Sequence, residues 1–280
     1  MSQQGTPLTD RFSPSGLDTW LKCEAQWSFR YVEGLRRPPS AAMTLGSGFD
    51  DAANDYYLEK RSFGQDPSDS DTRDRFAAAF DRRAADVEDW GEEKRAAMLD
   101  EGVAGVSSWR ERVALHVEPE QVQPRFEQQY ELPAEQAEAN EAAGIGNVVT
   151  LRGYLDLIGT VPKRGRLIVD HKFSRRSWTP ADVSRETQPV VYGFAFGVPV
   201  FQFHVLRRTK GTPATKILTR AVTQGDIAAT FQRIAITRRK VAVAVQTGDF
   251  LPNRKQPLCS RRWCGYWQEC ERKYGGRVTD

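Results

Sequence analysis

The chain has 280 residues, of which 39% are hydrophobic and 10% are aromatic. This composition supports one large domain or two modest ones, and it excludes a disordered chain. No apolar run approaches the roughly 20 residues that a membrane helix needs. Residues 1–7 lack the charged and apolar regions of a secretory signal. We therefore expect a cytoplasmic protein with no membrane contact.

The net charge of +3 conceals an uneven distribution along the chain. Residues 161–280 contain 23 lysines and arginines against 8 acidic residues, a balance of +15, whereas residues 1–160 have a balance of −12. A basic half suits a polyanionic partner, because neutralising phosphates releases counterions. A solvated basic surface explains the same count equally well, so charge alone leaves both interpretations open.

The first 120 residues have the periodicity of helices. Ser13-Pro-Ser15 is typical of a helix start, and apolar residues then recur at helical spacing, which predicts one helix over 12–33. We expect a second helix to begin near Gly46. A loop is predicted at 62–73, and one or two amphipathic helices at 74–116.

The pattern changes to strands near residue 124. The predicted elements are strands at 125–132, 148–158 and 166–172, a helix at 187–197, strands at 199–207 and 216–222 joined through Lys210-Gly-Thr-Pro, and a long helix at 224–247. This succession predicts an α/β fold with a central mixed β-sheet flanked by helices and a helical N-terminal portion.

Two of the predicted strands carry acidic residues. The second contains Gly153-Tyr-Leu-Asp156 and the third contains Asp170-His171-Lys172. Because strand side chains alternate, Asp170 and Lys172 share one face while the His171 side chain points away. If the strands are neighbours, Asp156 meets Asp170, and two carboxylates suit Mg²⁺ or Mn²⁺. Such a metal polarises a phosphoryl oxygen and acidifies water, and His171 would add only its main-chain carbonyl.

The following helix offers two more candidates. Gln188 and Tyr192 lie one helical turn apart on one face, where they could brace Lys172 and touch a phosphate. Lys172 itself would orient the attacking water. Each motif is weak by itself, since a solvated strand pair and an ordinary amphipathic helix explain them separately.

Four cysteines form the second constellation. Cys23 stands near the start, and Cys259-x4-Cys264-x5-Cys270 stands near the end. Four thiolates bind a [4Fe-4S] cluster, whereas structural zinc more often uses short Cys-x2-Cys pairs. The spacing favours iron–sulfur and leaves zinc open.

The succession Gly-x-x-Asp, Asp-x-Lys and Gln-x-x-x-Tyr resembles the PD-(D/E)XK nuclease superfamily, in particular its RecB-like branch. The segment from Phe12 to Cys23 resembles that branch's first helix with its first cluster cysteine, and the C-terminal trio resembles its remaining ligands. Over residues 12–270 the pattern is similar to RecB-type exonucleases of CRISPR adaptation and to the iron–sulfur nuclease domains of AddAB.

The resemblance implies a restriction-endonuclease-like core at 121–248, between a helical portion at 1–120 and an iron–sulfur tail at 249–280. It also implies a metal-dependent exonuclease acting on single-stranded DNA ends, with partners in recombination, phage replication or CRISPR adaptation. The alternative function is a DNA-binding or assembly module with a vestigial centre. Intact Asp156, Asp170 and Lys172 argue against that alternative.

One position departs from the family pattern. A histidine usually serves as an additional metal ligand on the early helix, and Asp50 stands at the matching place. A carboxylate is the harder ligand and can replace imidazole on Mg²⁺ or Mn²⁺. The alternative interpretation makes Asp50 and Asp51 a charge pair at a helix N-terminus.

Overall fold

The computed structural model describes residues 9–209 and 214–279. The chain forms two compact units, each drawn from separate segments. The terminal unit comprises Met1–Arg37, Phe126–Gly153 and Gln224–Asp280, and the sheet unit comprises Pro38–Arg125 and Tyr154–Thr223. The three-part division of the chain at residues 120 and 248 stays a prediction.

The sheet unit is built on a five-stranded mixed sheet with the order β2-β5-β6-β7-β8. Its strands are β2 (Glu118–Val122), β5 (Leu157–Val161), β6 (Gly165–Ser174), β7 (Val200–Arg207) and β8 (Ala214–Ala221). Only β6 and β7 pair in parallel; the other neighbours are antiparallel. A parallel pair needs a crossover, which is supplied by α7 (Pro180–Arg185) and α8 (Gln188–Phe196).

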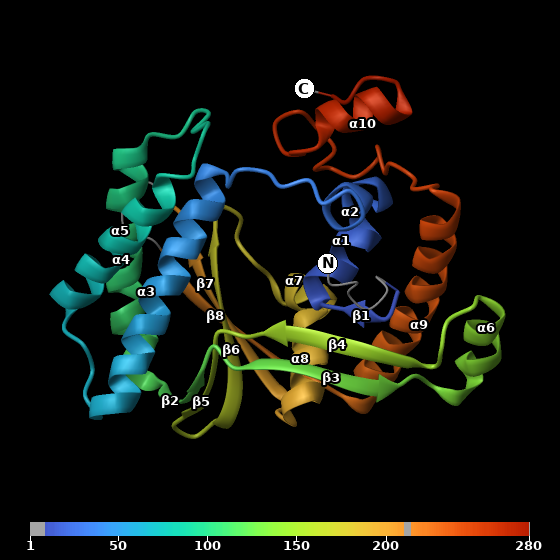
Figure 1. The fold of residues 1–280 in the computed structure, drawn as a ribbon. Coiled ribbons are helices and arrows are strands. Elements are labelled where there is room, and N and C mark those ends of the chain that lie inside the picture. The colour runs from blue at the N-terminus through green and yellow to red at the C-terminus, as the bar shows by residue number, and fades with distance from the viewer. Residues whose placement is uncertain (1–8, 210–213, 280) are drawn as a thin grey trace, which may run out of the picture. The chain divides into compact units, whose positions relative to one another are not determined.

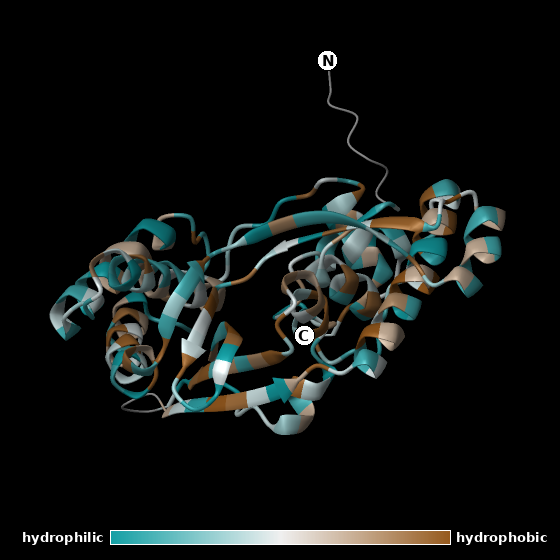
Figure 2. Ribbon diagram, turned by 90° about the horizontal axis from the view of Figure 1, so that it is seen from below, coloured by the Kyte–Doolittle hydropathy of each residue, from teal (hydrophilic) through white to brown (hydrophobic). Residues whose placement is uncertain are grey.

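Three helices of the same unit pack side by side (Figure 1). They are α3 (Ala41–Phe63), α4 (Asp69–Ala84) and α5 (Arg95–Arg112). Their apolar faces join the sheet in one buried cluster with Trp109 fully enclosed. Gly102 lets α5 approach α4 closely, because a Cβ there would lie 1.9 Å from the Phe76 ring. Hydrophobic stretches are visible along strands of the sheet, while the helices have mixed faces (Figure 2).

The terminal unit contains both ends of the chain. A three-stranded sheet has the order β1-β4-β3, and buried aromatic rings pack around Trp20, whose centroid is 5.2 Å from that of Trp27. Arg238 is fully buried and donates to the carbonyls of Thr9 and Gly146. The elements are β1 (Arg11–Phe12), α1 (Pro14–Lys22), α2 (Glu24–Tyr31), β3 (Arg125–Glu131), α6 (Ala137–Ala142), β4 (Val148–Tyr154), α9 (Gln224–Thr247) and α10 (Trp267–Tyr274).

The mixed α/β class with mixed sheets flanked by helices is confirmed, and the long helix at 224–247 has the predicted bounds. No helix in the described ranges is long and apolar enough to cross a membrane. The predicted link at Lys210-Gly-Thr-Pro lies outside the described residues.

Two predicted elements are each divided in the structure. The single helix expected at 12–33 is interrupted at Cys23, whose extended backbone (φ −164°) separates α1 from α2. The single strand expected at 148–158 becomes β4 and β5, which belong to different sheets. At this second break the main chain joins the sheet that contains β2, because the Asp156 carbonyl accepts from the N–H of Gln123, the residue after β2, at 2.9 Å.

Several boundaries also differ. Helix α3 begins five residues before Gly46, because the Ser40 hydroxyl accepts from the Met43 N–H and caps it there. The loop expected at 62–73 is shorter, since α3 runs to Phe63 and α4 starts at Asp69. The short elements β2, α6, α7 and α10 were not predicted, because few residues leave little periodicity to detect.

Candidate active site

The strand ladder of the sheet unit brings three of the predicted residues together. Leu157 of β5 pairs with Val169 of β6 in antiparallel register. Asp156 lies just before β5, and its Oδ2 accepts from the N–H of His171, the neighbour of Asp170 in β6, at 2.7 Å. Lys172 follows Asp170 by two residues on the same face of β6, and the charges of both Lys172 and Asp156 act on Asp170. The Lys172 ammonium forms an ion pair with Asp170 Oδ2.

Helix α8 adds two polar side chains to this group. Gln188 stands in its first turn, and its Oε1 accepts from Lys172 Nζ at 3.5 Å, a long hydrogen bond. Tyr192 lies one turn on, buried, and its side chain is hydrogen-bonded to Gln188. Lys172 Nζ also lies 6.0 Å from the centroid of the Phe203 ring. The lysine is therefore held between a carboxylate, an amide and an aromatic ring.

The two neighbouring aspartates of α3 have different environments. Asp51 Oδ1 and Oδ2 accept from Arg83 of α4 at 2.8 and 2.6 Å, a bidentate pair that links the two helices. Asp50 instead lies among the charges of Asp156, Asp170 and Lys172. Because α3 begins at Ala41, both aspartates lie in the helix interior, and their interpretation as an N-terminal charge pair is wrong.

Electrostatics couple the carboxylates of this site. Burial raises the pKa of Asp50 well above its ordinary value, and the Asp156 charge raises it further. Burial also raises the pKa of Asp156, and it raises the pKa of Asp170 to about 6. For Lys172, burial opposes the charged form, but the Asp170 carboxylate raises the pKa overall. Several carboxylates lie close to a single ammonium, so their negative charges are not fully compensated.

His171 has its backbone at the site and its ring elsewhere. Its N–H donates to Asp156 Oδ2 at 2.7 Å. In a strand the N–H and carbonyl of one residue point to the same side, so the His171 carbonyl also faces the Asp156 side. The ring packs against Phe49 and stacks on Tyr57 at 6.1 Å, and burial lowers its pKa to about 3. The imidazole is therefore neutral.

The carboxylates of this site can hold a hard cation such as Mg²⁺ only if other oxygen atoms complete its coordination shell. Within the described ranges, no three side chains of His, Cys, Asp or Glu form a ready metal-binding group. Mg²⁺ commonly takes one or two protein carboxylates and completes its shell with water and main-chain oxygens. Asp156 and Asp170, with the His171 carbonyl beside them, fit that requirement.

The four cysteines meet in the terminal unit. Cys23, at the α1–α2 junction, lines one cavity together with Cys259, Cys264 and Cys270, and all four are free thiols. Burial raises the pKa of the last three, and the Cys23 charge adds to this rise. The cavity has a volume of about 10 Å³, roughly one water, and within the described ranges the four thiols do not form a ready metal-binding group.

Two hydrogen-bond donors beside the cysteine sulfurs could not be predicted from the sequence. The Asn253 N–H donates to Cys23 Sγ at 3.4 Å, and the Arg254 guanidinium donates to Cys270 Sγ at 3.7 Å. Arg83 and Phe203 were missed in the sheet unit. No local signal marks any of these residues, because each contacts a partner that is distant along the chain.

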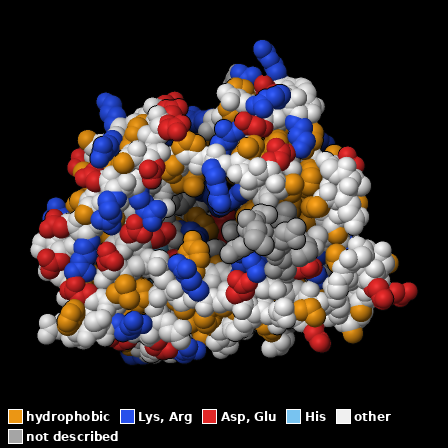
Figure 3. Space-filling view, in the orientation of Figure 1, with side chains coloured by type: hydrophobic (Ala, Val, Ile, Leu, Met, Phe, Trp, Pro, Cys, Tyr) orange, Lys and Arg blue, Asp and Glu red, His pale blue; other side chains and the backbone are white. Residues whose placement is uncertain are grey.

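The basic half of the sequence does not form a basic unit. The terminal unit contains 17 lysines and arginines against 14 acidic residues, a balance of +3, and the sheet unit contains 23 of each. Basic and acidic side chains are interspersed on the face shown in Figure 3. The sequence balance of +15 therefore identifies no binding surface.

Comparisons with known proteins agree on the type of fold. The family model of the PD-(D/E)XK nuclease superfamily matches residues 11–271. The crystal structure of a candidate exonuclease from Eubacterium rectale covers 92% of this chain and 92% of its own, with 15% identity and a TM-score of 0.54. That likeness shows a shared fold.

A second solved structure, SSO0001, covers 66% of this chain and 84% of its own at 13% identity, and its TM-score of 0.30 carries no argument. No curated protein matches the sequence. The family match spans nearly the whole chain and includes every residue of the carboxylate site and all four cysteines. The chain therefore belongs to the PD-(D/E)XK nuclease superfamily.

Proposed function

We propose that this protein is an Mg²⁺- or Mn²⁺-dependent deoxyribonuclease whose centre consists of Asp50, Asp156, Asp170 and Lys172. One observation carries the proposal: Asp156, held by the His171 N–H, lies close enough to Asp170 to raise its pKa, and Lys172 forms an ion pair with Asp170. Superfamily membership supports the reaction class. Here the assignment of catalytic roles rests on geometry and charge.

Each residue has a role that follows from its surroundings. Asp156 and Asp170 would hold the metal, with the His171 carbonyl completing one side and Asp50 contributing from α3. The bound metal would polarise the scissile phosphate and acidify a water molecule. Lys172 would orient that water and stabilise charge on the phosphate, while Gln188 and Tyr192 would keep the ammonium in place.

We further propose the RecB-like form of this activity, an exonuclease acting on single-stranded DNA ends. The four cysteines would hold a [4Fe-4S] cluster, supported by their common cavity and by two N–H···S contacts, which tune such clusters. Recombination, phage replication and CRISPR adaptation are the partner systems that the resemblance implies, in a cytoplasmic setting.

The deciding experiment measures cleavage of end-labelled linear and of circular single-stranded DNA with Mg²⁺, Mn²⁺ or EDTA. We expect metal-dependent degradation of linear DNA and survival of circles. Asp170→Asn should abolish cleavage, whereas Asp51→Asn, a matched change on the Arg83 pair, should retain it. Wild-type rates in Asp170→Asn protein would overturn the assignment of the centre, and cleaved circles would overturn the exonuclease mode.

A further inference from the structure

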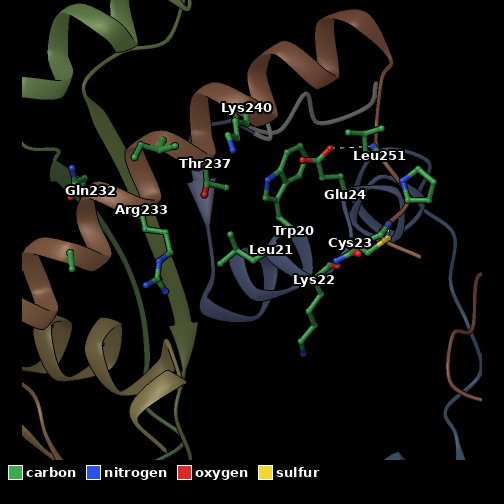
Figure 4. A pocket seen from close by; sticks show the side chains of 14 residues that line it. Trp20, Leu21, Lys22, Cys23, Glu24, Gln232, Arg233, Thr237, Lys240 and Leu251 are labelled. Atoms are coloured by element: carbon green, nitrogen blue, oxygen red, sulfur yellow. Dashed lines mark hydrogen bonds between the residues drawn. The ribbon is translucent and has the colours of Figure 1, made fainter. Parts of the chain in front are cut away.

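A groove in the terminal unit lies outside the carboxylate site and borders the cysteine site, because Cys23 and Asn253 are among the residues that line it. It has a volume of about 720 Å³, and one wall is a face of helix α9. The opposite wall is formed by the end of α1, residues 20–24, and by residues 251–253. Arg233, Thr237 and Lys240 extend from α9 toward Trp20 and Leu21 of α1 (Figure 4).

The α9 wall has a regular pattern along the helix. Ala229, Ile236 and Val243 are exposed and recur every seven residues, with Arg233 and Lys240 between them. Ile236 and Val243 are 39% and 52% exposed. The opposite face of α9 is buried in the unit. Because residues three and four apart share one face of a helix, these five residues form one stripe in which apolar and basic side chains alternate, and Val243 continues it beyond the groove.

The opposite wall is apolar and held in place. Leu21 and Leu251 are 49% and 74% exposed, which is unusual for two leucines that line the same depression. The Leu251 N–H donates to Glu24 Oε2 at 3.1 Å, and Asn253 Nδ2 donates to the Lys22 carbonyl at 3.0 Å. These bonds tie residues 251–253 to the α1–α2 junction, so the leucines have a fixed position.

The groove is positively charged. Lys22, Arg233 and Lys240 line it with exposed side chains. None of the three has an ion-pair partner among residues 9–209 and 214–279, whereas five other arginines of the terminal unit pair with acidic residues: Arg11, Arg37, Arg238, Arg261 and Arg272. Glu24, the one acidic residue in the lining, is engaged with the Leu251 N–H.

The residue types that line the groove favour one kind of occupant over others. A small molecule prefers a site that encloses most of its surface, whereas these aliphatic side chains are open to solvent. Single-stranded nucleic acid prefers aromatic side chains on which bases stack, and the one aromatic residue here, Trp20, is 4% exposed and packs edge-on against Trp27. Exposed aliphatic residues flanked by cations complement an amphipathic helix with acidic flanks.

We infer that this groove docks an acidic amphipathic helix of a partner protein. Apolar side chains of that helix lie between Ile236, Leu21 and Leu251, and its carboxylates pair with Lys22, Arg233 and Lys240. The inference is independent of the nuclease assignment, because no residue of the carboxylate site takes part.

The test uses displayed libraries of 20-residue helices with Leu, Ile or Val at 3-4 spacing. One library carries Asp or Glu on both flanks, and the other carries Lys or Arg. We expect binders from the acidic library alone, with affinity reduced about tenfold or more by Arg233→Glu/Lys240→Glu. A helix whose flanking acids are exchanged for lysines should regain affinity for that double variant.

Two controls make the result decisive. Arg82→Glu/Lys94→Glu, the same charge change on exposed residues of the sheet unit, should bind like the wild type, and Ile236→Asn should weaken binding without altering thermal unfolding. The inference is overturned if the acidic library yields no binder that is sensitive to the groove variants. It is equally overturned if a (dT)20 oligonucleotide displaces the helix from the groove, which would assign it to nucleic acid.

Discussion

The carboxylate site and the cysteine site are built in opposite ways. In the sheet unit, Asp170 lies within β6 and is 4% exposed, and Asp156, just before β5, accepts from the His171 N–H of β6. In the terminal unit, Cys23 lies between two short helices and the other cysteines lie in a tail with one helix of eight residues. Cys23, Cys259 and Cys264 remain partly exposed.

This difference indicates what each site needs from its ligand. A sheet positions carboxylates before any metal binds, at the cost of holding like charges together. In the tail, which has a single short helix, a cluster held by the cysteines would add its ligation energy to the folding energy. Metal loss should therefore leave the sheet unit folded and loosen the terminal unit.

The largest expected effect tests whether the carboxylate site can lose its activity while the cysteine site is unchanged. Lys172→Ala should reduce DNA cleavage by about 1,000-fold or more, because loss of a charge that stabilises the transition state costs several kcal/mol. Iron content should stay at the wild-type level, since no residue of the cysteine site changes. Parallel measurement of cleavage rate and bound iron checks this, and loss of iron in the variant would contradict the separation.

The reverse experiment changes Cys23, the cysteine between α1 and α2. Cys23→Ser should lose most of its bound iron and expose both chain ends to proteolysis, because one ligand of a four-thiolate centre is removed. The wild-type protein, purified without oxygen, should carry about four irons per chain. Iron analysis and limited proteolysis test both statements. One zinc in place of iron would refute the cluster and keep the four-cysteine site.

A third experiment compares the adjacent aspartates of α3. Asp50→Asn should raise the metal concentration needed for half-maximal activity by about 10- to 100-fold, as loss of a metal-site partner typically does. Asp51→Asn should leave that concentration unchanged and cost at most about 1 kcal/mol of stability, because its pair with Arg83 is at the surface. Equal metal requirements in both variants would remove Asp50 from the site.

A smaller effect is expected at α8. Gln188→Ala should lower the cleavage rate about tenfold, since Lys172 keeps its Asp170 partner and loses only a long hydrogen bond. The metal requirement should not change. A rate at fixed saturating metal, measured beside a metal titration, distinguishes this positioning role from metal binding, which would instead shift the titration.

The smallest effect concerns pH. The pKa of Asp170 is raised to about 6 in the fold, above its unfolded value of about 3.9. Its contribution to stability is therefore fully present below about pH 4 and is lost as pH rises through about 6. Without metal, thermal stability from this group should fall between pH 5 and 7.5. Mg²⁺ should bind at least about fourfold more tightly at pH 7.5 than at pH 5.5, because only ionised carboxylates are ligands and the pKa values of Asp50 and Asp156 are raised as well. Calorimetry at both pH values tests this, and tighter binding at pH 5.5 would contradict it.

Much of the molecule could be predicted from local patterns. The long helix at 224–247 and the strand at Arg125 follow from periodicity, and the superfamily follows from three motifs in the right order. The breaks at Cys23 and Asp156 could not be predicted, because the residues that contact them, Asn253 and Gln123, are distant along the chain. The contacts of Arg83 with Asp51 and of Arg254 with Cys270 could not be predicted for the same reason.

The amino-acid sequence by itself determined the element types, the superfamily and the candidate residues, since these depend on residue type and short-range spacing. Only the tertiary structure decided which charges gather, because the two units are assembled from interleaved segments. That interleaving disperses the +15 balance of residues 161–280 between both units. Asp50 and Asp51 meet different neighbours, because adjacent residues on a helix point about 100° apart.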